Sequence, residues 1–442
     1  MDKKKQVVST EQEPQSCGTT RRQFMQISAA ALAAGVLLGK TTRSFAAAKT
    51  IKIGYVSPQT GNLAAFGESD NFVVAQARKA VGSGITINGT SYPVQFVVRD
   101  SQSNPNRAGE VAAQLIKSDK VDFMISAGTP DTVNPVADQC ELNGTPNLSS
   151  DAPWQAWYFG RGGKPGKGFQ WTHHFCWGIE DLIAAYTDMW KQASTNKIVG
   201  GAWSNDVEGN TFRDEKLGFP GGFKAQGFKV IDPGGFQYTT QDFSAIISGL
   251  KRDRAEIFNP NMPLPTFSTF WSQALQQGYH PKIATIGKAL LFPASLDALG
   301  AKARNLTCET WWHPTYPFKS GMTGQTAQQI CDEWERTTHK QWTQPIGLRH
   351  ALFEVAVNVL KRLKNPNDPK SYVEAIRATN YDSVAGHIQF SGSLSPNPNV
   401  CRTAVTTGQW VPGKKWKWDL VVVASGFYKQ CKPQAKMNYM SY

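Results

Sequence analysis

The residues best suited to metal or catalytic chemistry do not form a recognisable catalytic pattern. His173-His174 and His313 could bind a metal ion, but no carboxylate or further histidine stands at metal-ligand spacing beside them. The sequence has no G-x-S-x-G nucleophile turn and no phosphate-binding Gly-Lys loop. These patterns argue against an enzyme, and no cofactor or metal is expected.

Aromatic side chains are the more promising functional groups. The chain has 14 Trp, and they cluster at Trp154 with Trp157 and Tyr158, at Trp171 with Trp177, and at Trp311-Trp312. Aromatic faces suit apolar or aromatic ligands, and they attract cations. Packing in the core explains any single tryptophan equally well, so both interpretations stay open.

Alternating strand and helix patterns must position these side chains. Apolar strands are expected at 51–56, 94–98, 121–125, 197–202, 228–231, 256–259 and 283–286, with helical stretches between them. Asn104-Pro105 should start one helix, because Asn caps and Pro suits the first turn. Repeated β-α units predict an α/β fold with doubly wound parallel sheets, which bind ligands at the carboxyl ends of their strands.

The N-terminus has the pattern of a removable export signal. Arg21-Arg22 precede an apolar run at 27–38, and Ala46-Ala47-Ala48 provides a cleavage site. The run is too short to span a bilayer, which takes about 20 residues. The paired arginines resemble a twin-arginine signal, whose cargo is exported folded. We therefore expect residues 1–48 to be removed and a soluble periplasmic protein to begin near Lys49.

The remaining 394 residues are enough for two domains. Removing seven basic and three acidic residues with the signal lowers the net charge from +13 to +9. This excess is compatible with an anionic solute, an anionic membrane surface or solubility alone. No Lys-Arg stripe with interleaved aromatics is present, so no nucleic acid partner is expected.

Six cysteines follow the signal, and an even number in an oxidising compartment suggests disulfides. Six cysteines allow fifteen pairings. We expect Cys308–Cys331 and Cys401–Cys431, each closing a local loop. Cargo that folds before export must already hold its sulfurs close together.

Four segments carry a family resemblance in order. They are IGYVSPQTGNLAAFG at 53–67, VRDSQSNP at 98–105, FMISAGT at 123–129 and QDFS at 241–244. Together they resemble the type I periplasmic binding proteins of ABC transporters, in the class that binds branched-chain amino acids. The resemblance extends over nearly all of 49–425.

The resemblance implies two lobes that close on a solute by a hinge motion. Three crossings are expected near 175–177, 308–310 and 386–388, so that 49–175 with 309–386 forms lobe I and 176–308 with 387–442 forms lobe II. The expected partners are a small-molecule solute and a permease in the inner membrane, with the protein a monomer. A sensor that docks on a receptor, and a hydrolase or lyase on the same fold, are the alternatives.

The resemblance also selects candidate site residues. They are Phe66 on the first loop; Thr129, Pro130, Asp131 and Thr132 on the loop expected to hold a carboxylate; Ser149, Ser150 and Asp151 on the next loop; Glu180 after the first crossing; and Glu208, where the family has an aromatic residue. Trp177 and Trp311 join them from the aromatic clusters. Helix capping is the alternative role for Thr129 and Ser149, and hinge or cap roles are the alternatives for Asp151 and Glu180.

One departure from the family concerns the solute. Amino acid-binding members place a glutamate after the strand at 284–287 to pair with the α-ammonium, whereas this chain has Lys288. A buried ammonium without a carboxylate partner is costly, so a free amino acid is a poor candidate. Lys288 meets either an anionic solute or solvent. We expect a small carboxylate or neutral solute with an apolar or aromatic body, and an amino acid or amide as the alternative.

Overall fold

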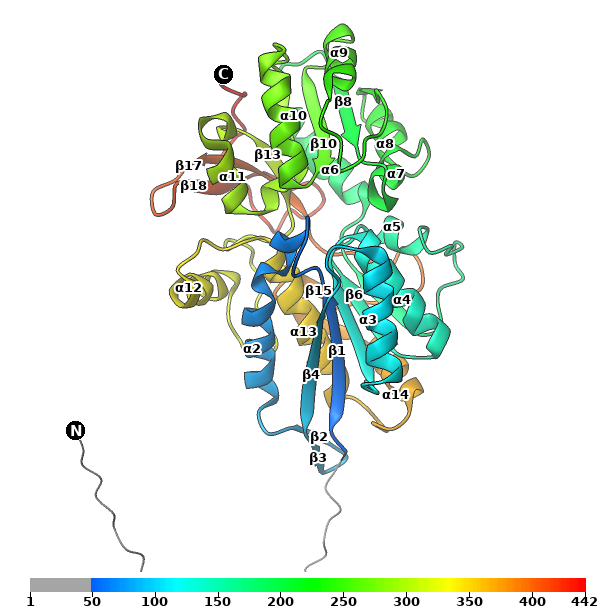
Figure 1. Cartoon of the computed structure of the whole chain (residues 1–442). Helices are drawn as coiled ribbons and strands as arrows, with labels where there is room; N and C mark the ends of the chain where they lie inside the picture. The colour runs from blue at the N-terminus through cyan, green and yellow to red at the C-terminus, as the bar shows by residue number, and fades with distance from the viewer. Residues whose placement is uncertain (1–48) are drawn as a thin grey trace, which may run out of the picture. The chain divides into compact units, whose positions relative to one another are not determined.

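The computed structural model describes residues 49–442 (Figure 1). The predicted export signal, with Arg21 and Arg22, lies outside the described residues. Within 49–442, no helix combines the length and apolar character needed to cross a membrane.

The first sheet is parallel and has six strands in the order β16-β7-β6-β5-β1-β4. Its strands are β1 (Ile51–Ser57), β4 (Val94–Asp100), β5 (Phe123–Ala127), β6 (Asn147–Ser150), β7 (Thr172–Phe175) and β16 (Val400–Cys401). Side chains alternate along β1, so Ile53 and Tyr55 enter one core and Val56 enters the other. Both faces of the sheet are therefore covered by helices.

Helices lie on opposite sides of this sheet (Figure 1). One side has α2 (Asp70–Val81) and α13 (Pro345–Lys361), and the other has α3 (Pro105–Lys117) and α4 (Pro130–Asn143). The predicted cap of α3 is confirmed, because the Arg107 N–H donates to Asn104 Oδ1 at 3.0 Å. Shorter elements complete this part: η1 (Ala64–Ser69), α5 (Trp154–Tyr158), α14 (Pro369–Arg377), and the hairpins β2 (Ile85–Ile87) with β3 (Thr90–Tyr92) and β14 (Asn380–Ser383) with β15 (Gly386–Gln389). We call this part lobe I.

Lobe II contains a second parallel sheet. Its strands are β8 (Ile198–Trp203), β9 (Lys229–Ile231), β10 (Ile257–Met262), β11 (Ile283–Ala284) and β12 (Gly287–Lys288). Its helices are α6 (Ile179–Trp190), α7 (Val207–Arg213), α8 (Phe219–Ala225), α9 (Ser244–Arg252), α10 (Leu264–Gln276) and α11 (Pro293–Leu299). The predicted parallel β-α organisation is confirmed in both sheets.

A three-stranded antiparallel sheet adjoins lobe II. It consists of β13 (Thr307–Thr310), β17 (Thr406–Pro412) and β18 (Trp418–Ala424) in the order β13-β17-β18. Helix α12 (Ala327–Thr338) follows β13 in the chain and packs Trp334 against Phe72 of α2 at a ring-centroid distance of 5.4 Å. The alternation of strands and helices did not predict this sheet.

Strand pairing corrects the expected position of the third crossing. β16 pairs with β7 in the first sheet, and β17 pairs with β13, so the chain passes between the lobes between Cys401 and Thr406. The predicted crossing at 386–388 is wrong, because Gly386–Gln389 folds back on Asn380–Ser383 as a hairpin. The first passage follows β7, and the second follows β13, close to their expected positions.

The two predicted disulfides are not formed. All six described cysteines are buried and unbonded: Cys140, Cys176, Cys308, Cys331, Cys401 and Cys431. The Cys308 thiol lies 3.6 Å from the Leu290 carbonyl oxygen and 3.6 Å from Gln344 Nε2. Strand β16 holds Cys401 in the core of the first sheet, whereas Cys431 packs in the core of lobe II. The thiols therefore face different surroundings instead of one another.

Candidate functional site

The carboxyl ends of the strands of both lobes border one region, which we call the seam. Helix α4 of lobe I begins after β5, and helix α7 of lobe II begins after β8. Helices α4 and α7 contact one another, and burial raises the pKa of Asp131 in α4, with the charge of Asp206 in the same direction and that of Lys288 opposing it. Asp131 therefore lies near the charged groups of lobe II across the seam.

Four aromatic side chains fill the centre of the seam, and we call them the aromatic cluster: Phe66, Trp177, Phe292 and Trp311. The Phe66 ring centroid lies 5.1 Å from that of Phe292 and 6.0 Å from that of Trp311. The centroids of Trp177 and Trp311 are 5.5 Å apart. All four are buried. The indole N–H groups of Trp177 and Trp311 have no hydrogen-bond partner among residues 49–442. The structure thus brings together three predicted residues and adds Phe292.

The other tryptophan clusters pack inside the lobes. Trp157 stacks on His174 with centroids 5.0 Å apart and contacts Phe169. Trp312 donates its indole N–H to the Val384 carbonyl at 3.1 Å. Trp171 precedes β7, at the opposite end of the first sheet from the seam. For these residues packing is the observed role.

Lys288 lies in a cluster of polar groups from lobe II, which we call the ammonium cluster: Asp206, Glu208, Tyr238 and Lys288. Glu208 and Lys288 are buried, and Asp206 and Tyr238 are partly exposed. Lys288 Nζ is 2.8 Å from Glu208 Oε2, 3.4 Å from Asp206 Oδ2 and 2.8 Å from the Tyr238 hydroxyl. Only 2% of Lys288 is exposed, so the expectation that it reaches solvent is wrong. Three polar partners from other segments hold its charge inside the protein.

Local structure fixes this cluster. Asp206 caps α7 by accepting the Gly209 N–H at 2.7 Å, and it also accepts the Tyr238 hydroxyl. Burial opposes ionisation of Asp206, but Lys288 and these hydrogen bonds outweigh it and lower the pKa of Asp206 to about 2. Burial raises the pKa of Glu208 to about 7, against the influence of Lys288. At neutral pH the pair of Lys288 and Asp206 is ionised, and Glu208 is poised to titrate.

Asp151 is engaged in lobe I by a buried arginine. Arg349 of α13 is fully buried, and its Nε lies 3.1 Å from Asp151 Oδ2, while it also pairs with Asp70. The Tyr55 hydroxyl donates to Asp70 at 2.7 Å. Burial raises the pKa of Asp151 to about 6, although Arg349 opposes that shift. Asp151 thus has an internal partner beside the seam.

The start of α4 offers polar groups that the fold leaves free. The Thr129 hydroxyl is buried, and it makes no hydrogen bond within the described chain. It therefore does not cap the helix that begins at Pro130. The Thr132 hydroxyl donates to the Thr129 carbonyl at 3.1 Å. Among the predicted residues of this loop, Thr129 is the one whose buried hydroxyl makes no hydrogen bond in the described chain.

Ser149, Ser150 and Glu180 have different surroundings. The Ser149 hydroxyl lies 2.9 Å from His174 Nδ1, so it bonds within the sheet. Ser150 is buried at the end of β6. Glu180 accepts the Trp154 indole N–H at 3.0 Å and lies 3.3 Å from Arg402 Nε. These contacts fit the hinge role that the sequence left open for Glu180.

A cavity of about 10 Å³ adjoins the aromatic cluster, and Trp177, Glu208, Asn261 and Glu309 are among the residues that line it. A space of this size holds roughly one water molecule. A solute of several heavy atoms does not fit without a movement of the lobes or of the aromatic side chains.

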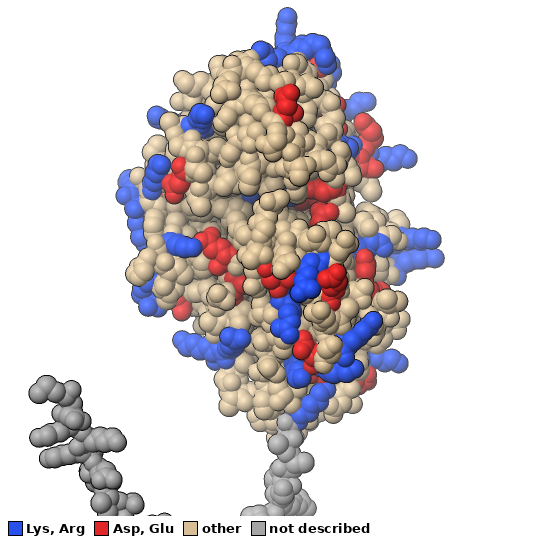
Figure 2. All heavy atoms as spheres, in the orientation of Figure 1, with Lys and Arg blue, Asp and Glu red and all other residues tan. Residues whose placement is uncertain are grey.

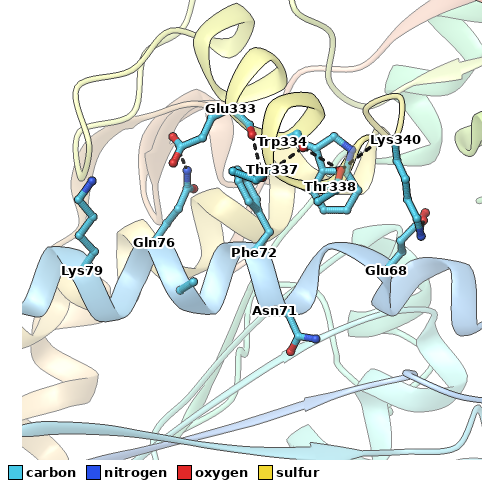
Figure 3. Close-up of a pocket in the computed structure, with 11 residues that line it drawn as sticks. Glu68, Asn71, Phe72, Gln76, Lys79, Glu333, Trp334, Thr337, Thr338 and Lys340 are labelled. Carbon is cyan, nitrogen blue, oxygen red and sulfur yellow. Dashed lines mark hydrogen bonds and ion pairs between the residues drawn. The ribbon is translucent and has the colours of Figure 1, made fainter. Parts of the chain in front are cut away.

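A much larger groove of about 550 Å³ lies on the surface between α2 and α12 (Figure 3). Its polar side chains pair with one another: Gln76 Nε2 donates to Glu333 at 3.2 Å, and Lys340 Nζ lies 2.8 Å from Glu68. Its lining comes mainly from the surfaces of α2 and α12, and the Glu68 end of the groove lies two residues along the chain from Phe66 of the aromatic cluster. On the face shown in Figure 2, basic and acidic side chains are interspersed.

Sequence reasoning missed several partners in the seam: Asp70, Asp206, Tyr238, Phe292, Glu309 and Arg349. Asp206 was detectable, because it stands in a cap position directly after a predicted strand. Arg349 was also detectable, because it stands with His350 and Glu354 in a helix of mainly apolar residues. The described residues contain no group of three or more His, Cys, Asp or Glu arranged to hold a metal ion.

These features define a two-lobed α/β protein with a buried aromatic cluster between its lobes. A sequence model of the periplasmic binding protein family matches residues 50–408, and the chain belongs to this family. The predicted family is thereby confirmed, and with it a solute-binding role.

Solved structures share the fold at low sequence identity. A leucine-binding protein from Thermotoga maritima is 19% identical with a TM-score of 0.68, covering 85% of this chain and 99% of its own. A solute-binding protein from Rhodopseudomonas palustris in complex with 4-hydroxybenzoate is 16% identical with a TM-score of 0.68, covering 85% and 96%. A branched-chain amino acid-binding protein from Streptococcus pneumoniae in complex with isoleucine is 16% identical with a TM-score of 0.61, covering 88% and 100%. No curated protein matches the sequence.

Proposed function

We propose that this protein is the extracytoplasmic solute-binding component of an ABC importer, and that it delivers a small organic solute with an aromatic or apolar body to an inner-membrane permease. It performs no catalysis of its own. The observation that carries the proposal is the aromatic cluster, which draws Phe66, Trp177, Phe292 and Trp311 from separate segments of the chain into one seam.

The hydrogen-bond donors of the seam indicate the polar end of the solute. An indole N–H donates and cannot accept, and those of Trp177 and Trp311 are buried without a partner in the described chain. Leaving a buried donor unpaired costs about 1–3 kcal/mol. A solute that accepts hydrogen bonds, such as a carboxylate or a carbonyl compound, removes this cost while its body packs against the rings.

Binding requires the lobes to open and close. The solute enters when the lobes separate, replaces the contact between the aromatic rings, and is enclosed as α4 and α7 approach again. This solute class includes 4-hydroxybenzoate, which one similar structure contains. Isoleucine, present in another, represents the amino acid alternative.

Titration calorimetry with 4-hydroxybenzoate, benzoate, leucine, isoleucine and short amides tests the solute class. We expect the aromatic acids to bind and the amino acids to bind weakly or not at all. Tight binding of leucine without a response to any aromatic or carboxylate compound would restore the amino acid class.

Variants of one tryptophan test the site. Trp311→Ala should weaken binding by about 2 kcal/mol or more, as expected for a buried aromatic anchor. Trp311→Phe keeps an aromatic ring but loses the N–H and part of the indole surface, so it should cost about 1 kcal/mol or more and less than Trp311→Ala. Trp171→Ala, at the far end of the first sheet, is the matched control. Equal affinities of Trp311→Ala and Trp171→Ala would remove the aromatic cluster from the site.

A further inference from the structure

Lys288 holds a fully enclosed ammonium group at the lobe II side of the seam. Its three N–H donors are matched by three oxygen atoms, on Asp206, Glu208 and Tyr238, at 2.8–3.4 Å. Nζ also lies 5.5 Å from the centroid of the Tyr238 ring. Asp206, Glu208 and Tyr238 thus form the kind of subsite that binds an ammonium ion, and the ammonium group of Lys288 occupies it.

The position of this subsite connects it to the solute. Lys288 ends β12 and Asp206 follows β8, so both stand at the strand ends that border the seam. Glu208 and Gly287 line the small cavity together with Trp177 of the aromatic cluster. Asp131 of lobe I is close enough for Asp206 and Lys288 to influence its ionisation. A solute in the seam therefore lies beside this subsite.

A buried ion pair is a weak way to stabilise a fold, because desolvation offsets the attraction between the charges. A buried ion pair is easier to explain if it determines which partner or ligand the protein binds. Here the ammonium of Lys288 occupies the carboxylates that a cationic solute would need, and it repels a second cation at the same place.

We infer that Lys288 is a built-in occupant of an ammonium subsite and makes the seam selective for solutes that carry no ammonium group. This inference rests on the proposed function, and it narrows the solute class to acids and neutral compounds. Under this inference, the side chain of Lys288 is what excludes free amino acids from the seam.

Chemical rescue tests the subsite without knowledge of the solute. Lys288→Ala leaves Asp206 and Glu208 beside an empty space shaped for three methylenes and an ammonium group. We expect a lower melting temperature for this variant, and a saturable increase with n-propylammonium that n-propanol does not reproduce. Lys288→Met fills the same space without charge, so neither it nor the unmodified protein should respond. A folded Lys288→Ala variant that n-propylammonium does not stabilise overturns the inference.

A matched pair of probes tests selectivity. Phenylalanine and 3-phenylpropanoate differ only in the α-ammonium group. Calorimetry should show that the unmodified protein prefers 3-phenylpropanoate, and that Lys288→Met shifts the ratio of affinities at least tenfold toward phenylalanine. This variant also serves if Lys288→Ala does not fold. An unchanged ratio overturns the inference and leaves the proposed function intact. Failure of the unmodified protein to bind either probe or 4-hydroxybenzoate counts against the proposed solute class, and rescue of Lys288→Ala by n-propylammonium then decides the inference alone.

Discussion

Acidification should destabilise the protein through its buried histidines, and His174 allows the effect to be isolated. His174 is completely buried; its Nε2–H donates to the Ala152 carbonyl at 2.8 Å, and its ring stacks on Trp157. Burial, together with the charge of Arg161, lowers the pKa of His174 from 6.5 to about 3. The folded protein therefore holds this imidazole neutral where the unfolded chain protonates it.

The sign and size follow from proton linkage. Between pH 6.5 and pH 3 the unfolded state binds more protons at His174, so the free energy of unfolding decreases as the pH falls. Each pH unit contributes about 1.4 kcal/mol, which gives roughly 3 kcal/mol at pH 4.5. Burial also lowers the pKa of His173 and His350 to about 3 and of His313 to about 4. Four such groups total on the order of 10 kcal/mol at pH 4.5, comparable with the whole stability of a typical protein.

Buried carboxyl groups act in the opposite direction. Burial raises the pKa of Asp151 to about 6, of Glu208 to about 7 and of Glu354 to about 8. Their folded forms bind protons more readily than their unfolded forms, so acidification through this range favours folding. The net loss in the unmodified protein is therefore smaller than the histidine sum, and a comparison of variants is needed to separate the two.

Urea unfolding of His174→Gln at pH 7.0 and pH 4.5 provides that comparison. The substitution lowers stability at both pH values, but the loss of stability between pH 7.0 and pH 4.5 should be roughly 3 kcal/mol smaller than in the unmodified protein. His280→Gln, at an exposed position, is the control and should leave the loss unchanged. Equal losses in His174→Gln and the unmodified protein would refute the description of a neutral, buried imidazole.

Three further outcomes are expected. Arg349→Met leaves Asp70 and Asp151 buried without their cation, so urea unfolding should show a loss of about 3–5 kcal/mol; a loss below 1 kcal/mol would contradict the buried pairing. The mature protein, purified without reductant, should react with a thiol reagent at six sites when denatured and at none when native, because all six thiols are buried; fewer than six sites in the denatured protein would reveal disulfides. Replacing Arg21 and Arg22 by Lys should leave the precursor in the cytoplasm, as fractionation can establish, and normal periplasmic levels would exclude the twin-arginine route.

Local patterns predicted the parts of the fold that depend on neighbouring residues. The apolar strand β1 and the Asn104-Pro105 start of α3 follow from propensity and capping. The antiparallel sheet was missed because β13 pairs with β17, about 100 residues away, and no local pattern encodes such a pairing. Gly386 looked like a crossing, whereas it forms a hairpin with the preceding strand.

The candidate site likewise contains residues that the sequence predicted and residues that it missed. The family resemblance selected Phe66, and the clustering of tryptophans in the sequence selected Trp177 and Trp311. Lys288 was misjudged because its partner Asp206 lies 82 positions earlier in the chain. From the sequence alone, a single lysine after a strand is expected to be exposed to solvent. The carboxylates that enclose Lys288 come from another segment and become visible only in the fold.

The first and third passages between the lobes are tied to each other along their length. The Cys176 N–H donates to the Cys401 carbonyl at 3.0 Å, and the next residue, Arg402, pairs with Asp181 and Glu180 at the start of α6. The second passage is joined to both of them, because Thr310 pairs with Thr406 and the Trp311 ring lies 5.5 Å from that of Trp177. A rotation of one lobe against the other should therefore move all three passages together, as one short multi-stranded joint.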